Sequence, residues 1–190
     1  MPLYNLDVIR AIDTFVVENE KSARKFIKQV CPEKVQADLD IYILNKDTEP
    51  EEMLDLIKLL DQNKTIGIIS EAGLPAVADP GAQLVKVAQQ KRIQVVPLVG
   101  PSSILLALMA SGMNGQNFAF HGYLPIDKTE RNKKLAHLEA ESAKTGIAQI
   151  FMETPYRNNQ MVDDLTKILR AETKICVACH ITLEDEDIRT

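Results

Sequence analysis

Hydrophobic and polar positions follow two periods along the chain, which predict strands and helices in turn. Short apolar runs, such as TFVVE at 14–18 and TIGII at 65–69, are typical of buried strands, whereas Met53, Ile57 and Leu60 recur at helical spacing. Their alternation predicts α/β layers with mostly parallel strands. The predicted strands are residues 14–18, 40–44, 65–69, 94–97, 147–152 and 174–181, and the predicted helices are residues 21–30, 50–60, 80–91, 101–110, 128–143 and 155–170.

A turn at residues 98–101, with the sequence LVGP, divides this pattern into two parts of comparable size. A predicted strand ends there, and a Gly-Pro turn leads into a helix of different, more apolar character. We therefore expect two small α/β domains, residues 1–98 and 99–190, with mixed, mostly parallel sheets. A cleft between two domains is a natural place for a ligand.

Composition narrows the class of protein. Of the 190 residues, 45% are hydrophobic and 26% are charged, which excludes a mainly disordered chain. The longest apolar run, residues 104–110, is shorter than the about 20 residues that span a bilayer, so no membrane association is expected. Three cysteines are too few for a disulfide framework and favour a reducing, cytoplasmic setting.

The net charge of −5 argues against broad nucleic-acid binding by the whole surface. Net charge does not report how charges are distributed, however, and a local basic face remains possible. One candidate for such a face is the basic cluster of Lys128, Arg131, Lys133 and Lys134.

The loop SEAGLPAVADPG at residues 70–81 carries the strongest signal for a ligand. It follows the predicted strand 65–69 and contains two glycines, two prolines and two carboxylates. Gly73 and Gly81 allow close approach to the backbone or a positive φ, and Glu71 and Asp79 supply acceptors. A long connector inside a compact domain is usually functional or disordered, and this loop is too apolar for disorder.

Three Xaa-Pro steps, Asp79-Pro80, Gly100-Pro101 and Thr154-Pro155, resemble helix starts with proline at the first helical position. They lie in predicted strand-to-helix loops, which meet at the carboxyl edge of a parallel sheet, where ligands bind. Simple helix initiation is the alternative interpretation of each step.

Two further segments carry polar groups whose role the sequence leaves open. His121 lies in FHGYLP just before a charged helix, and ETPYR at 153–157 combines a carboxylate with a guanidinium at a helix start. Cys176 and Cys179 belong to a literal C-x-x-C-H, but residues three apart on a strand point to opposite faces. We therefore expect free thiols, neither haem nor a metal site.

Four sequence blocks taken together identify a resemblance: ISEAGLPAVADPGAQLV, VVPLVGPSSILLALMASG, FAFHGYLP and METPYRNNQM. In this order they resemble the tetrapyrrole-methylase superfamily of S-adenosylmethionine-dependent enzymes, and within it the ribosomal RNA small-subunit methyltransferase I branch. The resemblance implies two α/β domains with the methyl donor S-adenosylmethionine between them, and a homodimer. It also implies 2′-O-methylation of a cytidine in small-subunit rRNA.

The resemblance also implies which residues bind the donor. Since a ribose hydroxyl must lose its proton, a carboxylate or histidine could act as general base, and the sequence does not rank Glu71, Asp79, His121 and Glu153 for this role. The implied donor-binding residues are Glu71, Ala72 and Gly73 in the donor-side loop, Gly100, Pro101 and Ser102 in the interdomain turn, and Glu153, Thr154, Pro155 and Arg157 at the helix start facing the donor.

The chain differs from the family at its two ends. Members begin with a strand and a T-P-[IL]-G-[ND] loop before the helix that NLDVIRAID at 5–13 resembles, and they continue beyond the last predicted strand. A chain truncated at both ends is therefore expected. Two alternatives remain: a methyltransferase for a tetrapyrrole or another small molecule, which the acidic charge favours, and a non-catalytic fragment that binds the donor or dimerises.

Overall fold

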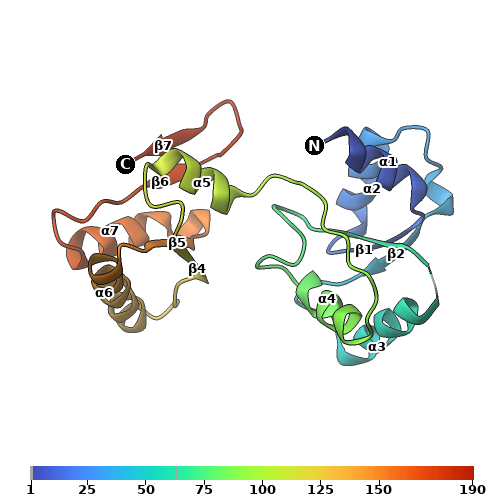
Figure 1. Cartoon of the computed structure of the whole chain (residues 1–190), viewed down its shortest axis with the longest axis horizontal. Coiled ribbons are helices and arrows are strands. Elements are labelled where there is room, and N and C mark those ends of the chain that lie inside the picture. Colours follow the sequence, from blue (N-terminus) through green and yellow to red (C-terminus); the bar gives the residue numbers. More distant parts are fainter. Residues whose placement is uncertain (1, 63) are drawn as a thin grey trace. The chain divides into compact units, whose positions relative to one another are not determined.

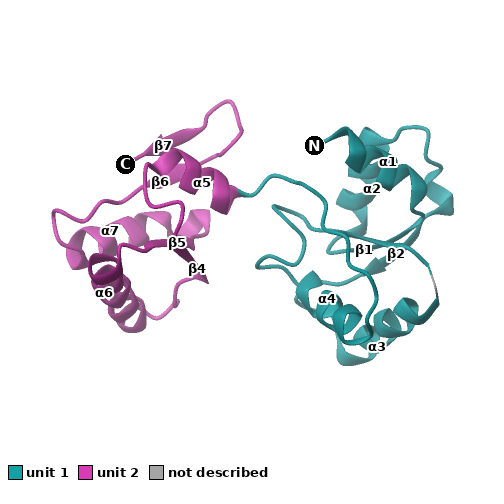
Figure 2. Ribbon diagram, in the orientation of Figure 1, with its two compact units in different colours: residues 1–102 teal, residues 103–190 magenta. Residues whose placement is uncertain are grey.

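A computed structural model describes residues 2–62 and 64–190 of the chain. It divides into two compact units, Met1–Ser102 and Ser103–Thr190, which we call unit 1 and unit 2 (Figure 2). Each unit combines helices with parallel strand pairs, which confirms the predicted α/β class.

Unit 1 is built on a three-stranded parallel sheet with the order β2-β1-β3 (Figure 1). Its three strands agree closely with the predicted strands that begin at 14, 40 and 65. The elements are α1 (Leu3–Ala11), β1 (Thr14–Val17), α2 (Glu20–Val30), η1 (Gln36–Asp38), β2 (Asp40–Ile43), α3 (Pro50–Leu59), η2 (Leu60–Gln62), β3 (Ile66–Ile69) and α4 (Gly81–Gln90).

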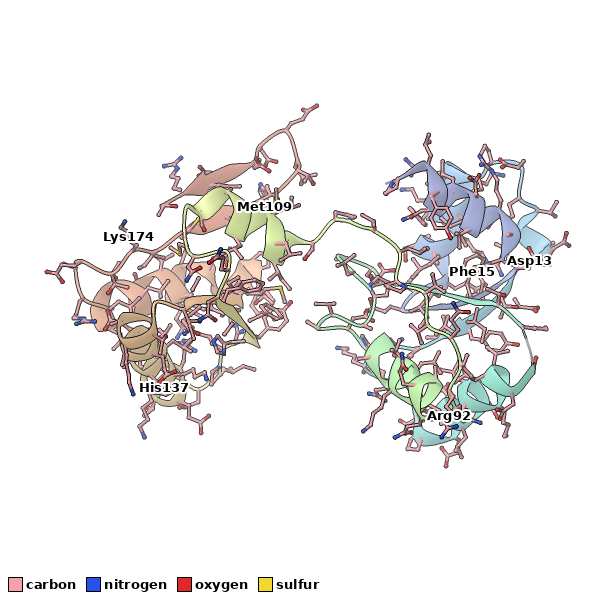
Figure 3. The ribbon with its side chains drawn as sticks, viewed as in Figure 1. Asp13, Phe15, Arg92, Met109, His137 and Lys174 are labelled. Atoms are coloured by element: carbon pink, nitrogen blue, oxygen red, sulfur yellow. The ribbon has the colours of Figure 1, made fainter. Side chains whose placement is uncertain are left out.

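The central strand β1 is buried along its whole length because helices cover both faces of the sheet. Phe15 and Val17 belong to a core cluster with α1 and α2, whereas Val16 belongs to a second cluster with α3 and α4. The Phe15 ring, labelled in Figure 3, packs so closely on β3 that a Cβ at Gly67 would lie 2.7 Å from it. Packing on both faces therefore fixes the positions of the three strands, and with them the positions of the residues at the carboxyl ends of these strands.

Unit 2 holds a parallel pair, β4-β5, and a separate antiparallel pair, β6-β7. Leu135 and Leu138 from α6 pack with Met161 and Leu165 from α7 to form its core. The elements are α5 (Ser103–Ser111), β4 (Phe118–Tyr123), α6 (Lys128–Thr145), β5 (Ala148–Met152), η3 (Pro155–Arg157), α7 (Asn158–Ile168), β6 (Val177–Cys179) and β7 (Asp187–Arg189).

The prediction of a strand at residues 94–97 is wrong. Within the described residues β3 pairs with β1 alone, and no strand ladder reaches this segment. A valine-rich sequence favours a strand only where a neighbour accepts its backbone hydrogen bonds, and here Val95 and Val96 are exposed instead. Two residues after this segment, the chain is held by a hydrogen bond to α1: Asn5 Nδ2 donates to the Val99 carbonyl at 2.8 Å.

Two elements of unit 2 are shorter in the structure than the sequence predicted. The helix predicted at 155–170 is a 3-10 turn, η3, followed by the α-helix α7. The strand predicted at 174–181 is reduced to β6, so Cys176 lies outside the observed strand. The antiparallel partner of β6, which is β7, was not predicted.

Cys176 and Cys179 are free thiols, as is the buried Cys31. None of the helices in residues 2–62 and 64–190 has the length and hydropathy that a bilayer-spanning segment requires.

Candidate functional site

Polar residues gather where the three parallel strands of unit 1 end. Glu18 follows β1 directly, Asn45 follows β2, and Ser70 and Glu71 follow β3. Asn45 Nδ2 donates to the Glu18 carbonyl at 3.4 Å, which joins the ends of two adjacent strands. The carboxyl edge of a parallel sheet is where ligands bind in open α/β proteins. We call this edge, with the loop 70–81, the carboxylate edge.

Glu71 is held at this edge by the neighbouring strand and helix. Its backbone N–H donates to Glu18 Oε1 at 2.8 Å, and its carboxylate accepts a hydrogen bond from the Ser22 hydroxyl on the first turn of α2. Sequence analysis selected Glu71 but missed Glu18 and Ser22. The available signal for Glu18 was its position, a carboxylate directly after the buried run 14–17.

Asp79 both shapes the loop and accepts an N–H at the start of α4. Its Oδ1 accepts the N–H groups of Ala76 at 2.9 Å and Gly81 at 2.8 Å, and Gly81 is the first residue of α4. The loop is tightly turned, since Ala76 and Ala78 have positive φ angles of 67° and 54°. The bond from the Gly81 N–H agrees with the predicted capping role of Asp79, and Pro80 has helical angles, φ −58° and ψ −28°, although α4 itself begins one residue later.

The carboxylate edge carries negative charge that no ion pair within the described residues offsets. Glu18, Glu71 and Asp79 each accept hydrogen bonds from N–H or O–H groups, and none contacts a lysine or arginine. Burial raises the pKa of the Glu18 carboxyl, the N–H of Glu71 opposes this rise, and the Asp79 and Glu71 carboxylates add to it. Such an edge favours ligands with cationic groups or hydroxyl donors.

The turn at Gly100 lies beside the loop 70–81 in unit 1. A Cβ at Gly100 would meet Leu74 Cδ2 at 2.9 Å, so the two segments, far apart in sequence, are in contact. Gly73 has a φ of 71° and open space on its Cβ side, which leaves the backbone of this loop accessible. Pro101 does not open a helix, because α5 begins at Ser103; the predicted helix start at Gly100-Pro101 is therefore wrong. Ser102 is buried.

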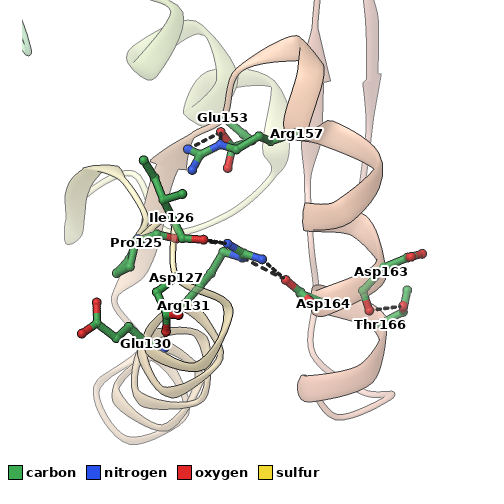
Figure 4. A network of polar contacts seen from close by, with 10 residues as sticks. All are labelled: Pro125, Ile126, Asp127, Glu130, Arg131, Glu153, Arg157, Asp163, Asp164 and Thr166. Atoms are coloured by element: carbon green, nitrogen blue, oxygen red, sulfur yellow. Dashed lines mark hydrogen bonds and ion pairs between the residues drawn. The ribbon is translucent and has the colours of Figure 1, made fainter.

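In unit 2, Glu153 follows β5 and is neutralised by Arg157 (Figure 4). Glu153 Oε1 accepts from Arg157 Nη2 at 2.6 Å and Nε at 2.7 Å, and from the Thr154 N–H at 2.7 Å. Thr154 precedes the first residue of η3, Pro155, so here proline does open a helical segment, although the segment is a 3-10 turn. Glu153, Thr154, Pro155 and Arg157 thus form one compact corner.

Arg131 is buried and does not belong to a basic surface, which makes that part of the predicted basic cluster wrong. Its Nε and Nη2 donate to Asp164 Oδ2 at 2.8 and 2.6 Å, and both side chains are 2% exposed. Its Nη1 donates to the carbonyls of Pro125 and Ile126 (Figure 4). The pair therefore binds the segment before α6 to α7. Lys128 and Lys133 are exposed, and Lys134 is half-buried.

His121 bonds across the sheet rather than to the Glu153 corner. Its Nε2 lies 2.6 Å from Gln149 Oε1, between β4 and β5. No group of three or more histidine, cysteine, aspartate or glutamate side chains in residues 2–62 and 64–190 has the spacing of a metal site.

Comparisons with known proteins place these features in context. The family model for tetrapyrrole (corrin/porphyrin) methylases matches residues 1–190, the whole chain. The chain is 30% identical to the ribosomal RNA small subunit methyltransferase I of Vibrio cholerae, over 97% of this chain and 61% of that protein. It is 27% identical to the Escherichia coli O157:H7 protein of the same name over 96% and 61%, and 35% identical to that of Halalkalibacterium halodurans over 74% and 47%. The chain thus spans at most 61% of the length of these relatives.

Proposed function

The chain belongs to the family of tetrapyrrole (corrin/porphyrin) methylases. On this premise we propose that it acts as an S-adenosylmethionine-dependent methyltransferase. The acceptor is the 2′-hydroxyl of a cytidine in small-subunit rRNA, and the reaction takes place in the cytoplasm. One observation carries this proposal: curated relatives named for ribosomal RNA small-subunit methylation align with 96–97% of the chain.

The carboxylate edge suits the donor. S-adenosylmethionine carries a sulfonium and an ammonium, which a carboxylate attracts by its charge, and ribose hydroxyls, which donate hydrogen bonds to a carboxylate. Glu71 would bind such a group, while Ala72 and Gly73 offer backbone atoms with open space beside them. Gly100 borders the same loop through its contact with Leu74. When bound, the donor would supply an electrophilic methyl group: the acceptor oxygen attacks the methyl carbon while its bond to sulfur breaks, and the neutral thioether is the leaving group.

The contribution of the chain's own residues is to orient and to accept a proton. Holding two reactants in a near-attack geometry supplies about 7–11 kcal/mol of a barrier. Among the proposed bases, Glu153 is neutralised by Arg157, Asp79 already accepts two N–H groups, and the His121 Nε2 already bonds to Gln149 Oε1. Glu71 accepts a single hydroxyl hydrogen bond from Ser22. We therefore retain Glu71 as the candidate that can still accept a proton or a ligand hydroxyl.

The partner of this chain, beyond the RNA, is a second copy of itself. Helix α5 has the sequence SILLALMAS without a charged residue, and Met109, labelled in Figure 3, is 78% exposed. Exposed apolar patches of this kind are usual at protein interfaces. An apolar hollow of about 410 Å³ adjoins this helix, lined by Leu105, Leu108, Met109, Gly112, Met113, Gly115 and Phe118. These features support a homodimer, which sedimentation of the wild type against Met109→Glu tests.

Donor binding is tested by calorimetric titration of S-adenosylmethionine into the chain. The wild type should bind, and Glu71→Gln should weaken binding at least about tenfold, or about 1.4 kcal/mol. Glu51→Gln, which removes an exposed carboxylate on the first turn of α3, is the matched control and should bind like the wild type. Equal affinities for all three proteins would contradict the role of the carboxylate edge.

Methyl transfer is tested with labelled donor and small ribosomal subunits that lack the modification. The expected product after nuclease digestion is 2′-O-methylcytidine. Label found in an added tetrapyrrole and none in the RNA would replace this proposal by the small-molecule alternative.

A further inference from the structure

One helix of unit 1 carries a row of lysines on its exposed side. In α2, with the sequence EKSARKFIKQV, the residues Lys21, Lys25 and Lys28 are all exposed. At about 100° per residue, Lys25 and Lys28 lie within about 40° of Lys21 around the helix axis. With a rise of about 1.5 Å per residue, the row extends over about 10 Å. We call these three residues the lysine row.

The lysine row points away from the core and is not neutralised. The core side of α2, with Ala23 and Ile27, lies on the opposite side of the helix and is fully buried. No lysine of the row takes part in an ion pair with another described residue. Arg24, which lies at the margin of the row, pairs with the helix's only acidic residue, Glu20, at 2.7 Å. The remaining positive charge is therefore free for a ligand.

Other lysines on helices do not form such a surface. On α3, Lys58 pairs with Asp55 at 2.7 Å and stands among further acidic residues of the same helix. On α6, lysines alternate with Glu130, Glu139 and Glu141 along the sequence. In a chain of net charge −5, the one-sided charge of α2 is thus a local exception rather than an average property.

The row begins at the carboxylate edge. Lys21 immediately precedes Ser22, whose hydroxyl donates to the Glu71 carboxylate, and α2 itself starts two residues after Glu18. A polyanion that follows the lysine row would therefore arrive at the place proposed for the donor. A membrane surface fits less well, because the apolar side of α2 is packed in the core and cannot enter a bilayer interface.

We propose that the lysine row of α2, formed by Lys21, Lys25 and Lys28, binds the phosphate backbone of the RNA substrate and leads the strand toward the carboxylate edge. This inference rests on the proposed function for its substrate class. Lysine contacts to phosphates are independent of base sequence and strongly dependent on salt. The row therefore supplies affinity and direction, whereas the choice of nucleotide belongs to other residues.

The test compares two triple variants that each remove three positive charges from exposed lysines of unit 1. The first is Lys21→Gln, Lys25→Gln and Lys28→Gln; glutamine has nearly the helix propensity of lysine, so α2 should stay folded. The matched control is Lys58→Gln, Lys64→Gln and Lys86→Gln. Binding of a short fluorescein-labelled single-stranded RNA of mixed sequence is measured by anisotropy over a series of salt concentrations. Circular dichroism checks that each variant is folded.

We expect the row variant to bind the RNA at least about tenfold more weakly at low salt, and the control to bind nearly as the wild type does. The slope of log affinity against log salt should fall by about 2 in the row variant, because each neutralised phosphate of a single strand contributes about 0.7. An equal loss in both variants, an unchanged slope in the row variant, or a wild type without RNA affinity would overturn the proposal. So would wild-type binding to phosphatidylserine vesicles or polyglutamate that depends on the row and exceeds the binding to RNA.

A donor titration separates this inference from the function on which it rests. S-adenosylmethionine affinity should be the same in the row variant and the wild type, since no lysine of the row holds the donor. A wild type that binds RNA through the row but binds no donor would refute the methyltransferase and leave the lysine row standing. A row variant that loses donor affinity together with RNA affinity would refute the row as a separate RNA surface.

Discussion

The carboxylates at the carboxylate edge of unit 1 and two carboxylates of unit 2, Glu153 and Asp164, differ in what surrounds them. In unit 1, Glu18 and Glu71 accept hydrogen bonds from backbone N–H and hydroxyl groups and meet no cation within the described residues. In unit 2, Glu153 is neutralised by Arg157, and Asp164 is neutralised by Arg131. Burial explains why the two carboxylates of unit 2 have cationic partners. The Asp164 side chain is 2% exposed and the Glu153 side chain is 9% exposed, and a buried charge must be paired.

This difference separates two uses of the same chemical group. A carboxylate that is buried with an arginine cannot be removed without leaving an uncompensated charge inside the fold, and it has little capacity left for a ligand. A solvated carboxylate with only weak donors around it costs the fold little and can exchange water for a ligand. Substitutions at the paired carboxylates of unit 2 should therefore change stability first, and substitutions at the carboxylate edge should change ligand binding first.

The largest effect is expected at the Arg131–Asp164 pair. Asp164→Ala leaves a buried guanidinium without its anion and should reduce the free energy of unfolding by about 3–5 kcal/mol. Urea denaturation of the chain, followed by circular dichroism, measures this loss. The double variant Arg131→Met and Asp164→Leu removes both charges and should recover most of it. A single variant as stable as the wild type would contradict the assignment of this pair to the fold.

A smaller loss of stability is expected at the Glu153 corner. Glu153→Ala removes the acceptor of Arg157 and of the Thr154 N–H, and should cost about 1–3 kcal/mol of unfolding free energy. Glu153→Gln is the control, because an amide oxygen can still accept the Thr154 N–H. If Glu153→Ala instead left the unfolding midpoint unchanged and abolished donor binding, the corner would belong with the ligand-facing carboxylates of unit 1.

In unit 1, Gly100→Val should affect donor binding more than folding. Its Cβ would press on Leu74 Cδ2 from 2.9 Å, and a side-chain end can move away, carrying the loop 70–81 with it. We expect donor affinity to fall about tenfold, or about 1.4 kcal/mol. Gly115→Ala, where a Cβ meets nothing within 4 Å, is the control for the calorimetric titration. Unchanged affinity in Gly100→Val would make this turn a mere connector.

The smallest effect concerns pH and Glu18. Burial raises the pKa of this carboxyl above its ordinary value of 4.5, so the folded protein binds more protons than the unfolded chain between the two values. Stability therefore falls as pH rises through that window. Glu18→Gln stays neutral and should be slightly more stable than the wild type at neutral pH, with the difference vanishing below pH 4.5.

The urea unfolding midpoints of the wild type and of Glu18→Gln, each measured at neutral pH and below pH 4.5, give this difference in stability. Glutamine can still accept the Glu71 N–H, so the comparison isolates the charge. A variant less stable than the wild type at neutral pH would show that the ionised Glu18 supports the fold, in contrast to the distinction between the units.

Much of the fold is determined by local sequence. The strands 14–17 and 40–43 and the helices α2, α3 and α6 appear within one or two residues of their predicted bounds, because their periodicity is strong. Glu71 and Gly73 could be selected in the same way, since a loop with glycines and carboxylates after an apolar, strand-like run is visible in the chain itself. The family resemblance was likewise confirmed by the match over residues 1–190.

Tertiary contacts decided the rest. Residues 94–97 have the composition of a strand, but no neighbouring strand pairs with them in the described part of the chain. Arg131 lies in a run of charged residues that is typical of a solvated helix face, yet it is buried because Asp164, 33 positions away in sequence, meets it. Glu18 gained its place beside Glu71 only when two strands became parallel neighbours. Pairing partners distant in sequence leave no local signature, so only the folded chain shows which charges are neutralised and which remain available for a ligand.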